Sequence, residues 1–234
     1  MSTGARDQIL HGIRRALGRG PLDESAAAPL RDRLAAPSPN LVPQRTQGLD
    51  ADALLAMFKS FMEEADTSVA VVPDAAAVPK AVTAYLAGHN LPAEAAMAPD
   101  AALDAYPWDT QPMLRLRRGP ARESDAVGIT PAFAAIAESG TLMLTSGADR
   151  PTTLNFLPGT HVVILRKDQL VGSYEQAWAK LRHSAAAHNN DKGGEAMPRA
   201  VNLISGPSRT GDIEQQLFLG AHGPVRLHII VVER

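Results

Sequence analysis

Serine, threonine and arginine gather in one segment near the carboxyl end of the 234-residue chain, at positions 205–214. The segment follows a strand-like run and precedes a helix-like one, so its backbone N–H groups can face an anion. Hydroxyl groups add hydrogen-bond donors, and an arginine adds a planar cationic fork that suits a carboxylate or a phosphate. The candidate ligand-binding residues of this segment are Ser205, Gly206, Ser208, Arg209, Thr210 and Asp212.

The same segment also has a purely structural interpretation. Serine, threonine and aspartate commonly cap helices, and residues 213–219 predict a helix directly after the segment. Thr210 or Asp212 would then only close that helix. The segment has neither the Gly-Lys-Ser/Thr of a Walker A loop nor the GxGxxG spacing of a dinucleotide-binding turn.

His222 is the second candidate, in the turn formed by residues 220–224. The nearby glycines leave the ring room, and Gly223 adds a position where a ligand can approach the backbone. Imidazole changes its charge near neutral pH, so His222 is a candidate catalytic acid or base. Alternatively, the ring only bonds a backbone carbonyl and fixes the turn. Gly220 is expected to end the preceding helix.

The turn Glu138-Ser139-Gly140-Thr141 is the third candidate. Glu138 offers a carboxylate for proton transfer, and the three residues after it offer ligand contacts. Gly140 is expected to end a helix. In the structural alternative, Glu138 is simply a solvated side chain.

We expect these three turns to converge on one cleft. The 205–212 turn leaves a strand at its carboxyl end, where ligands of open α/β sheets bind. A straight helix over 213–219 would hold the 220–224 turn roughly 10 Å from it. The single cleft therefore requires the chain to fold back.

Strand-like and helix-like segments alternate along the chain, which predicts an α/β fold with a mainly parallel sheet. The run 69–72 is entirely apolar, which is typical of a strand covered on both faces. Thr130 and Pro131 suit the start of a helix over 131–137. The expected strands are 69–72, 113–116, 126–129, 141–145, 161–165, 201–204 and 227–232. The expected helices are 5–17, 54–62, 76–87, 131–137, 174–185 and 213–219.

Three parts are expected in the chain. Residues 1–20 form an amphipathic helix, 21–48 a linker, and 49–234 the main domain. The helix is expected to dock on its own domain or on a neighbouring subunit, which allows a homo-oligomer. An arginine-rich amphipathic start also imitates a transit peptide, against which Asp7 argues.

Composition excludes several classes of protein. The 25 acidic and 23 basic residues give a net charge of -2, which argues against nucleic-acid binding. No apolar run approaches the ~20 residues of a membrane span, and no secretory signal is visible, so we expect a cytoplasmic protein. With no cysteine, the chain can hold neither a disulfide nor an ordinary iron–sulfur cluster. The seven histidines are scattered, and no metal site is predicted.

Several ordered segments resemble the LUD-domain family, to which LutC and YkgG belong. The similarity covers about residues 125–234, and the first residues also look like the usual LutC start. Arg209 and Gly211 depart from the pattern, because small residues are expected at both positions. The segments that carry the resemblance are 136–142, 157–158, 161–163, 205–208 with 210 and 212–214, and 220–224.

The resemblance implies a fold like that of the NagB/RpiA/CoA-transferase superfamily, a Rossmann-like layer with a mostly parallel sheet, preceded here by an N-terminal helical arm. It also implies an accessory component, without an iron–sulfur cluster, of a LutABC-type complex that oxidises L-lactate to pyruvate. The implied partners are LutA-like and LutB-like iron–sulfur proteins. The resemblance names neither a cofactor nor a catalytic residue, and leaves open whether the chain is itself an enzyme.

Analogy with the wider superfamily offers an alternative. The chain would then be a stand-alone enzyme or binding protein for a small anionic metabolite, such as a sugar phosphate, a CoA ester or a folate-like molecule. Fold analogy alone is a weak basis for function.

Overall fold

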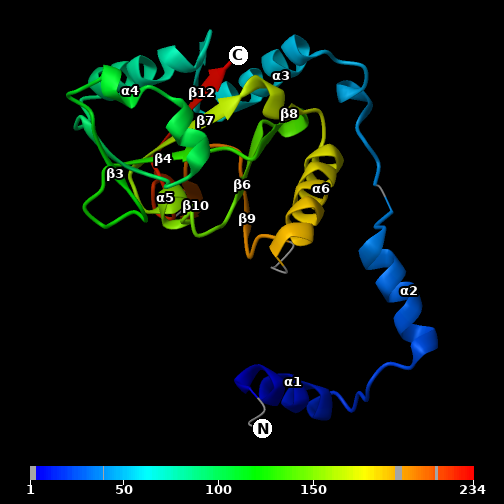
Figure 1. The fold of residues 1–234 in the computed structure, drawn as a ribbon. Coiled ribbons are helices and arrows are strands. Elements are labelled where there is room, and N and C mark those ends of the chain that lie inside the picture. Colours follow the sequence, from blue (N-terminus) through cyan, green and yellow to red (C-terminus); the bar gives the residue numbers. More distant parts are fainter. Residues whose placement is uncertain (1–3, 39, 193–196, 214–215) are drawn as a thin grey trace. The chain divides into compact units, whose positions relative to one another are not determined.

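The computed structural model describes residues 4–38, 40–192, 197–213 and 216–234 (Figure 1). The chain divides into two compact units, Met1–Leu41 and Val42–Arg234. The helices are α1 Ala5–Ala16, α2 Glu24–Ala35, α3 Ala51–Glu64, α4 Val78–Gly88, α5 Thr153–Phe156 and α6 Tyr174–Lys192. The strands are β1 Ser68–Val72, β2 Glu94–Met97, β3 Arg115–Arg118, β4 Val127–Pro131, β5 Ala134–Ile136, β6 Thr141–Thr145, β7 Thr160–Arg166, β8 Leu170–Val171, β9 Val201–Ile204, β10 Arg209–Ile213, β11 Gln216–Leu219 and β12 Arg226–Val232.

A six-stranded sheet in the order β1-β12-β7-β4-β2-β3 forms the centre of the second unit, and all its neighbouring strands pair in parallel. Its central strands are continuously apolar because both faces are covered. Along β7, Val162 and Ile164 belong to the core that includes α4. Val163 and Leu165 belong to the core on the other face, with α3. The predicted α/β fold with a mainly parallel sheet is confirmed.

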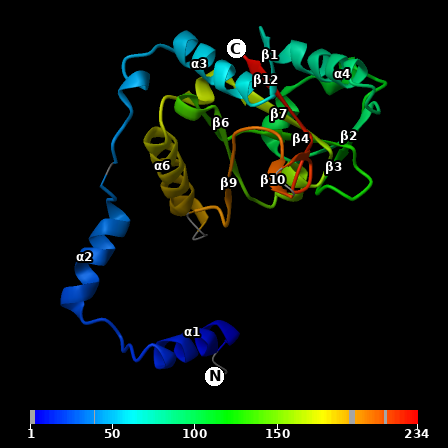
Figure 2. The same cartoon turned by 180° about the vertical axis from the view of Figure 1, so that it is seen from behind.

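A smaller sheet in the order β8-β5-β6-β9 lies against the α3 face of the larger one. Leu142 and Leu144 of β6 point into the core shared with α3. Met143 points the other way, into the core that contains Leu181 of α6. The layers are therefore α4, the parallel sheet, α3 with the small sheet, and α6, as the front and back views show (Figures 1 and 2).

The run 69–72 does form a strand, but it is not covered on both faces as predicted. β1 is an edge strand of the parallel sheet, and its Val71 is 42% exposed. An apolar run alone does not distinguish an edge strand from a central one, because β-branched residues favour both.

The helix predicted over 131–137 is wrong. Residues 127–131 form β4, and residues 134–136 form β5. Thr130 caps no helix, since its hydroxyl lies 2.8 Å from Nε2 of His161. The alanines of β5 are fully buried and pair with β6 and β8. Tertiary burial overrides the weak helix preference of this short segment.

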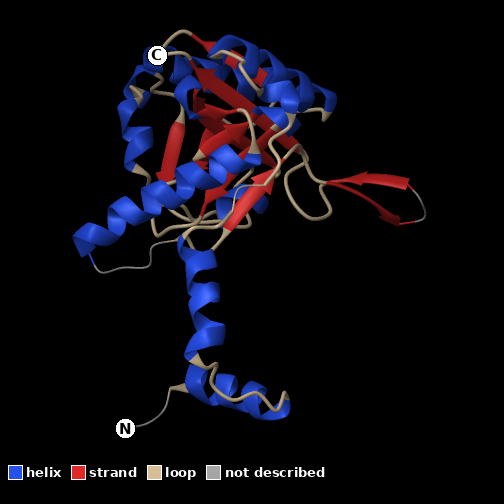
Figure 3. Cartoon of the chain, turned by 90° about the vertical axis from the view of Figure 1, so that its right-hand side faces the viewer, coloured by secondary structure: helices blue, strands red, loops and turns tan. Residues whose placement is uncertain are grey.

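The helix predicted over 213–219 is also wrong. β10 and β11 pair antiparallel, with Arg209 opposite Leu219 and Thr210 opposite Phe218. Figure 3 shows this hairpin extending from the domain. Gly220, expected to end a helix, has a φ of 80° in the turn after β11. A single turn or two of helix is marginal in water, so strand pairing decides the structure here.

The amino-terminal unit holds two helices rather than a helix and a linker. α1 lies within the predicted helix, but α2 occupies much of the segment interpreted as a linker. Asp23 caps α2 by accepting from the Ala26 N–H at 2.8 Å. Neither helix has a buried residue. Among the described residues, none of the helices combines the length and the apolarity that a bilayer crossing requires.

Candidate functional site

A cavity of about 310 Å³ collects most of the residues singled out in the carboxyl-terminal segments, and we call it the motif pocket. Its walls come from α5, from the starts of β7 and β12, and from the turns after β9 and β11. The residues that line it are Asn155, Phe156, His161, Leu203, Ile204, Ser205, Gly206, Pro207, Ser208, Arg209, His222, Gly223, Pro224 and Leu227.

Backbone hydrogen bonds hold the two predicted turns together. The Ser208 N–H donates to the Pro224 carbonyl at 2.8 Å, and the Ser208 carbonyl accepts from the Gly220 N–H at 2.9 Å. Oγ of Ser208 accepts from the His222 N–H at 3.2 Å. The β10–β11 hairpin brings the two turns together. β10 begins beside the end of β11, with Arg209 opposite Leu219. The structure thus brings the 205–209 and 222–224 segments to one cavity.

Arg209 lines the motif pocket, but its guanidinium pairs with Asp66. The Asp66 carboxylate is 79% exposed, so the pair is largely solvated. Thr210 is buried behind the pocket, and Asp212 lies further along β10. Among the described residues, Thr210 does not line the cavity, so this candidate does not join the others. The side chain of Asp212 lies outside the part of the chain that the structure describes.

The 138–141 turn touches the motif pocket only indirectly. The Thr141 hydroxyl lies 2.7 Å from that of Ser205, which lines the cavity. Ser139 and Tyr174 complete a cluster of four hydroxyl groups, at 2.8 Å and 2.9 Å from the Thr141 oxygen. Ser139, Gly140 and Thr141 do not line the pocket. The prediction that all three turns form one cleft is therefore wrong for this turn.

The structure contradicts the solvated alternative for Glu138, and the catalytic role expected of it stays a prediction. Its side chain is only 5% exposed, so it is not a solvated carboxylate, and it does not line the motif pocket. Its Oε1 accepts from the Tyr174 N–H at 2.9 Å, at the first turn of α6. A carboxylate there satisfies a free helix N–H and favours the positive end of the helix dipole. Glu138 thus fixes the start of α6.

Gly140 ends a short 3-10 turn with a φ of 57°, a left-handed conformation that favours glycine. A Cβ at this position would lie 2.5 Å from Cβ of Phe61 on α3. The sequence predicted that Gly140 ends a helix, and it does end a helical turn, although of the 3-10 type. The left-handed φ and the close packing against α3 both require glycine here, and the ligand contact expected of Gly140 stays a prediction.

His161 is the pocket residue that the sequence pattern concealed. It is the second residue of β7 and is 1% exposed, with Nε2 facing the Thr130 hydroxyl. Burial lowers the pKa of His161 to about 3, because a charged imidazolium loses its hydration there. The ring therefore stays neutral at physiological pH. A polar residue near the start of a mostly apolar strand was the available signal.

The motif pocket lies at the amino ends of β7 and β12, not at the carboxyl ends of the parallel strands. His161 and Leu227 stand near the first positions of their strands, and both line the cavity. The turn after β9 does follow the carboxyl end of its strand, as expected. However, β9 belongs to the small sheet, where it pairs antiparallel to β6.

The chemistry available here is binding and proton exchange. A neutral, buried imidazole and the hydroxyls of Ser205 and Ser208 surround the cavity, while His222 is exposed beside it. These groups suit a small, oxygen-rich molecule, with His222 placed to exchange a proton with solvent. Among the described residues, no cluster of three or more histidine, aspartate and glutamate side chains could hold a metal ion.

Comparison with known proteins adds a family and a fold. The family model described as the LUD domain matches residues 51–232. "Lactate utilization protein C" of Halalkalibacterium halodurans is 41% identical over 111 residues, which are 47% of this chain and 46% of that protein. "Uncharacterized protein YkgG" of Escherichia coli is 39% identical over 111 residues, with the same coverage. These alignments span about half the length of the curated relatives.

A solved structure agrees on the fold. The crystal structure of a DUF162 family protein from Deinococcus radiodurans superimposes with a TM-score of 0.58 at 24% identity. The match covers 79% of this chain and 99% of that chain. The likeness extends the α/β architecture beyond the half of the chain that the curated relatives match.

Proposed function

The chain belongs to the LUD domain family, and from this premise we propose that it is an accessory component of lactate utilisation. It would act without an iron–sulfur cluster of its own, beside LutA-like and LutB-like iron–sulfur proteins that oxidise L-lactate to pyruvate. The observation that carries this proposal is the 36–41% identity to several proteins named Lactate utilization protein C. The complete absence of cysteine supports the assignment of the clusters to partner chains.

The motif pocket is the site through which we propose that the chain serves this role. Two of the segments that carry the family resemblance, 205–208 and 222–224, meet there although the hairpin separates them in sequence. A volume of about 310 Å³ is small for a ligand pocket and suits a molecule of the size of lactate or pyruvate. The neutral imidazole of His161 can exchange hydrogen bonds with a hydroxyl or keto oxygen without adding charge.

Deletion of the gene tests the pathway. We expect the deleted strain to grow poorly on L-lactate and normally on pyruvate, and a plasmid copy to restore growth. A tagged copy, purified under anaerobic conditions from lactate-grown cells, should carry cluster-containing proteins identified by mass spectrometry and by their visible absorption. Normal growth on lactate in a strain without another lactate dehydrogenase would overturn the proposal, as would purification without any cluster protein.

A stand-alone role in binding a small anionic metabolite is the second candidate. The polar turn with Arg209 in the motif pocket supports it, although Asp66 already offsets that charge. The two candidates differ in what the purified chain does alone. Calorimetric titration with lactate, pyruvate, a sugar phosphate and CoA would favour the second candidate only if the isolated chain bound one of them without partners.

A further inference from the structure

A second and larger cavity, of about 640 Å³, lies at the opposite end of the small sheet. Thr145 and Ser146 at the carboxyl end of β6 line it, together with Ala200 just before β9. Phe133, just after β4, and α6 supply another wall. We call this cavity the arginine pocket because, among the residues that the structure describes, Arg150 and Arg199 line it and no acidic residue does. Its volume is within the range usual for small-molecule sites.

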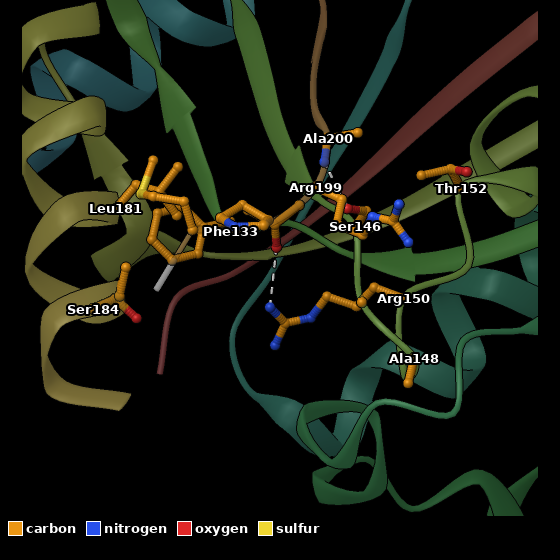
Figure 4. Close-up of a pocket in the computed structure, with 14 residues that line it drawn as sticks. Phe133, Ser146, Ala148, Arg150, Thr152, Leu181, Ser184, Arg199 and Ala200 are labelled. Atoms are coloured by element: carbon orange, nitrogen blue, oxygen red, sulfur yellow. Dashed lines mark hydrogen bonds between the residues drawn. The ribbon is translucent and has the colours of Figure 1, made fainter. Parts of the chain in front are cut away.

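Arg150 is the fixed cation of the arginine pocket. Its Nε pairs with the Asp100 carboxylate, which is 4% exposed, and its Nη1 donates to the Thr145 hydroxyl at 3.0 Å. An arginine carries five N–H donors, so these two bonds hold the guanidinium while Nη2 keeps its hydrogens for another acceptor. In the close-up, the side chain reaches across the pocket toward the side of Phe133 (Figure 4).

The opposite wall of the arginine pocket is apolar. Phe133, Leu181 and Met197 line it, and Met197 is 40% exposed. Figure 4 places Phe133 and Leu181 on one side of the cavity and the Arg150 loop on the other. A ligand with one anionic end and one apolar end would satisfy both walls. The Arg150 guanidinium, held by Asp100 and Thr145, presents a planar fork of N–H donors that matches a carboxylate.

We propose that the arginine pocket binds a small organic carboxylate, with its carboxylate on Arg150 and its apolar body against Phe133, Leu181 and Met197. This site is separate from the motif pocket and goes beyond the role in lactate utilisation. Binding measurements on the purified chain test this proposal, and they are independent of the growth phenotype that tests the role in lactate utilisation. The buried Asp100 carboxylate orients the cation, and the half-exposed Asp149 carboxylate lies 4.0 Å from the same Nε. Neither aspartate lines the pocket.

Methyl NMR of the purified full chain tests the proposal with two matched probes. The chain has seven methionines, so a sample labelled at the methionine methyl groups gives few signals. Met197 reports on the pocket, and Met62, Met97 and Met143 report on the buried core. The probes are 3-phenylpropanoate, which has a phenyl ring and a carboxylate, and the neutral 3-phenylpropanol.

The expected result is a saturable shift of the Met197 signal by the acid, with at least about tenfold weaker binding of the alcohol, the loss typical of one charge-assisted hydrogen bond. The double variant Asp100→Asn/Arg150→Gln removes both charges of the pair together and should abolish the preference for the acid. Unchanged signals from the core methionines confirm that it folds. Arg182→Gln, on exposed α6 surface outside the pocket, should retain the preference.

A second variant leaves the ion pair untouched. Ser184→Phe adds bulk to the pocket wall and should weaken both probes. The proposal is overturned if neither probe shifts Met197 saturably, or if acid and alcohol bind the wild-type chain equally. It is also overturned if a folded double variant keeps the preference, or if Ser184→Phe leaves binding unchanged.

Discussion

The motif pocket and the arginine pocket lie at opposite ends of β6 and β9, and each contains an arginine paired with an aspartate. In the motif pocket, Arg209 pairs with Asp66, whose side chain is 79% exposed. In the arginine pocket, Arg150 pairs with Asp100, whose side chain is 4% exposed. The same two residue types therefore form a solvated pair in one place and a structural anchor in the other. The two arginines are similarly exposed, at 38% and 34%, so the burial of the aspartate partner decides how firmly each arginine is held.

Single substitutions of the two arginines should give the largest difference between the pockets, measured as the loss in the free energy of unfolding. Arg150→Ala leaves the buried Asp100 carboxylate without its cation, and we expect a loss of about 3–5 kcal/mol in the free energy of unfolding. Arg209→Ala leaves an exposed carboxylate in water, and we expect a loss below about 1 kcal/mol. Denaturant unfolding followed by circular dichroism measures both values.

The double variant Arg150→Ala/Asp100→Asn controls for the orphaned charge. It should recover a large part of the stability that Arg150→Ala loses, because the unpaired ion is gone. Equal losses in the two single variants would contradict the distinction between a buried and an exposed pair.

Gly140→Ala tests the assignment of the 138–141 turn to structure instead of ligand binding. The new Cβ would meet Phe61 at 2.5 Å, and the φ of 57° disfavours alanine. We expect a loss of about 2–4 kcal/mol from overpacking and backbone strain together. Thermal unfolding measures it, with Gly88→Ala as a matched control, because a Cβ at Gly88 meets nothing within 4 Å. A stable Gly140→Ala protein that fails only in lactate growth would return the turn to the functional site.

The neutral histidine of the motif pocket predicts a pH dependence. Burial lowers the pKa of His161 from 6.5 to about 3, so the unfolded chain binds a proton there that the folded chain does not. Stability is complete above pH ~6.5 and falls with decreasing pH toward about 3, by up to about 1.4 kcal/mol per pH unit. His161→Gln should reduce this slope by about one proton in denaturant unfolding between pH 6.5 and pH 4.5.

His228 supplies the control for that slope. Burial lowers its pKa to about 4, and it lies beside Ser68 and Tyr85, away from both pockets. His228→Gln should reduce the slope in a similar way without affecting the motif pocket. Superimposable pH profiles of wild type and His161→Gln would show that His161 is not held neutral by the fold.

The smallest effect is expected from removal of residues 1–41. Helices α1 and α2 have no buried residue. The free energy of unfolding of the remaining domain should change by less than about 0.5 kcal/mol, as for exposed residues generally. Self-association or partner docking should weaken, because apolar residues such as Ile9 and Ile13 are exposed on α1. Sedimentation velocity and denaturant unfolding measure the two effects. An unfolded truncated chain would make these helices part of the core.

The central strands could be predicted from the sequence because each contains several consecutive apolar residues. β7 contains the apolar run 162–165 and β12 the run 229–232, and apolar cores cover both faces of these strands. The two wrong helices, over 131–137 and 213–219, are short segments in which pairing with distant strands decides the structure. Local propensity does not contain that information.

The candidate site could be predicted only where the chemistry is local. The turns around Ser208 and His222 show their polar and glycine residues directly in the sequence. His161 acquires its neutral state from burial by distant residues, and Arg150 acquires its orientation from Asp100, which is 50 positions away. Neither property is visible in a single stretch of sequence. The contact of Glu138 with the start of α6 was not visible either, because Tyr174 lies 36 positions away in the sequence.

The most direct test of the motif pocket is complementation of the deleted strain with single variants at matched expression. The account predicts that His222→Ala and Ser208→Ala slow growth on L-lactate severalfold and leave growth on pyruvate unchanged. The control His183→Ala changes an exposed histidine of α6 that lines neither pocket, and it should grow like wild type on both. Wild-type growth of the His222→Ala and Ser208→Ala strains on lactate would contradict the account and return both residues to a purely structural role.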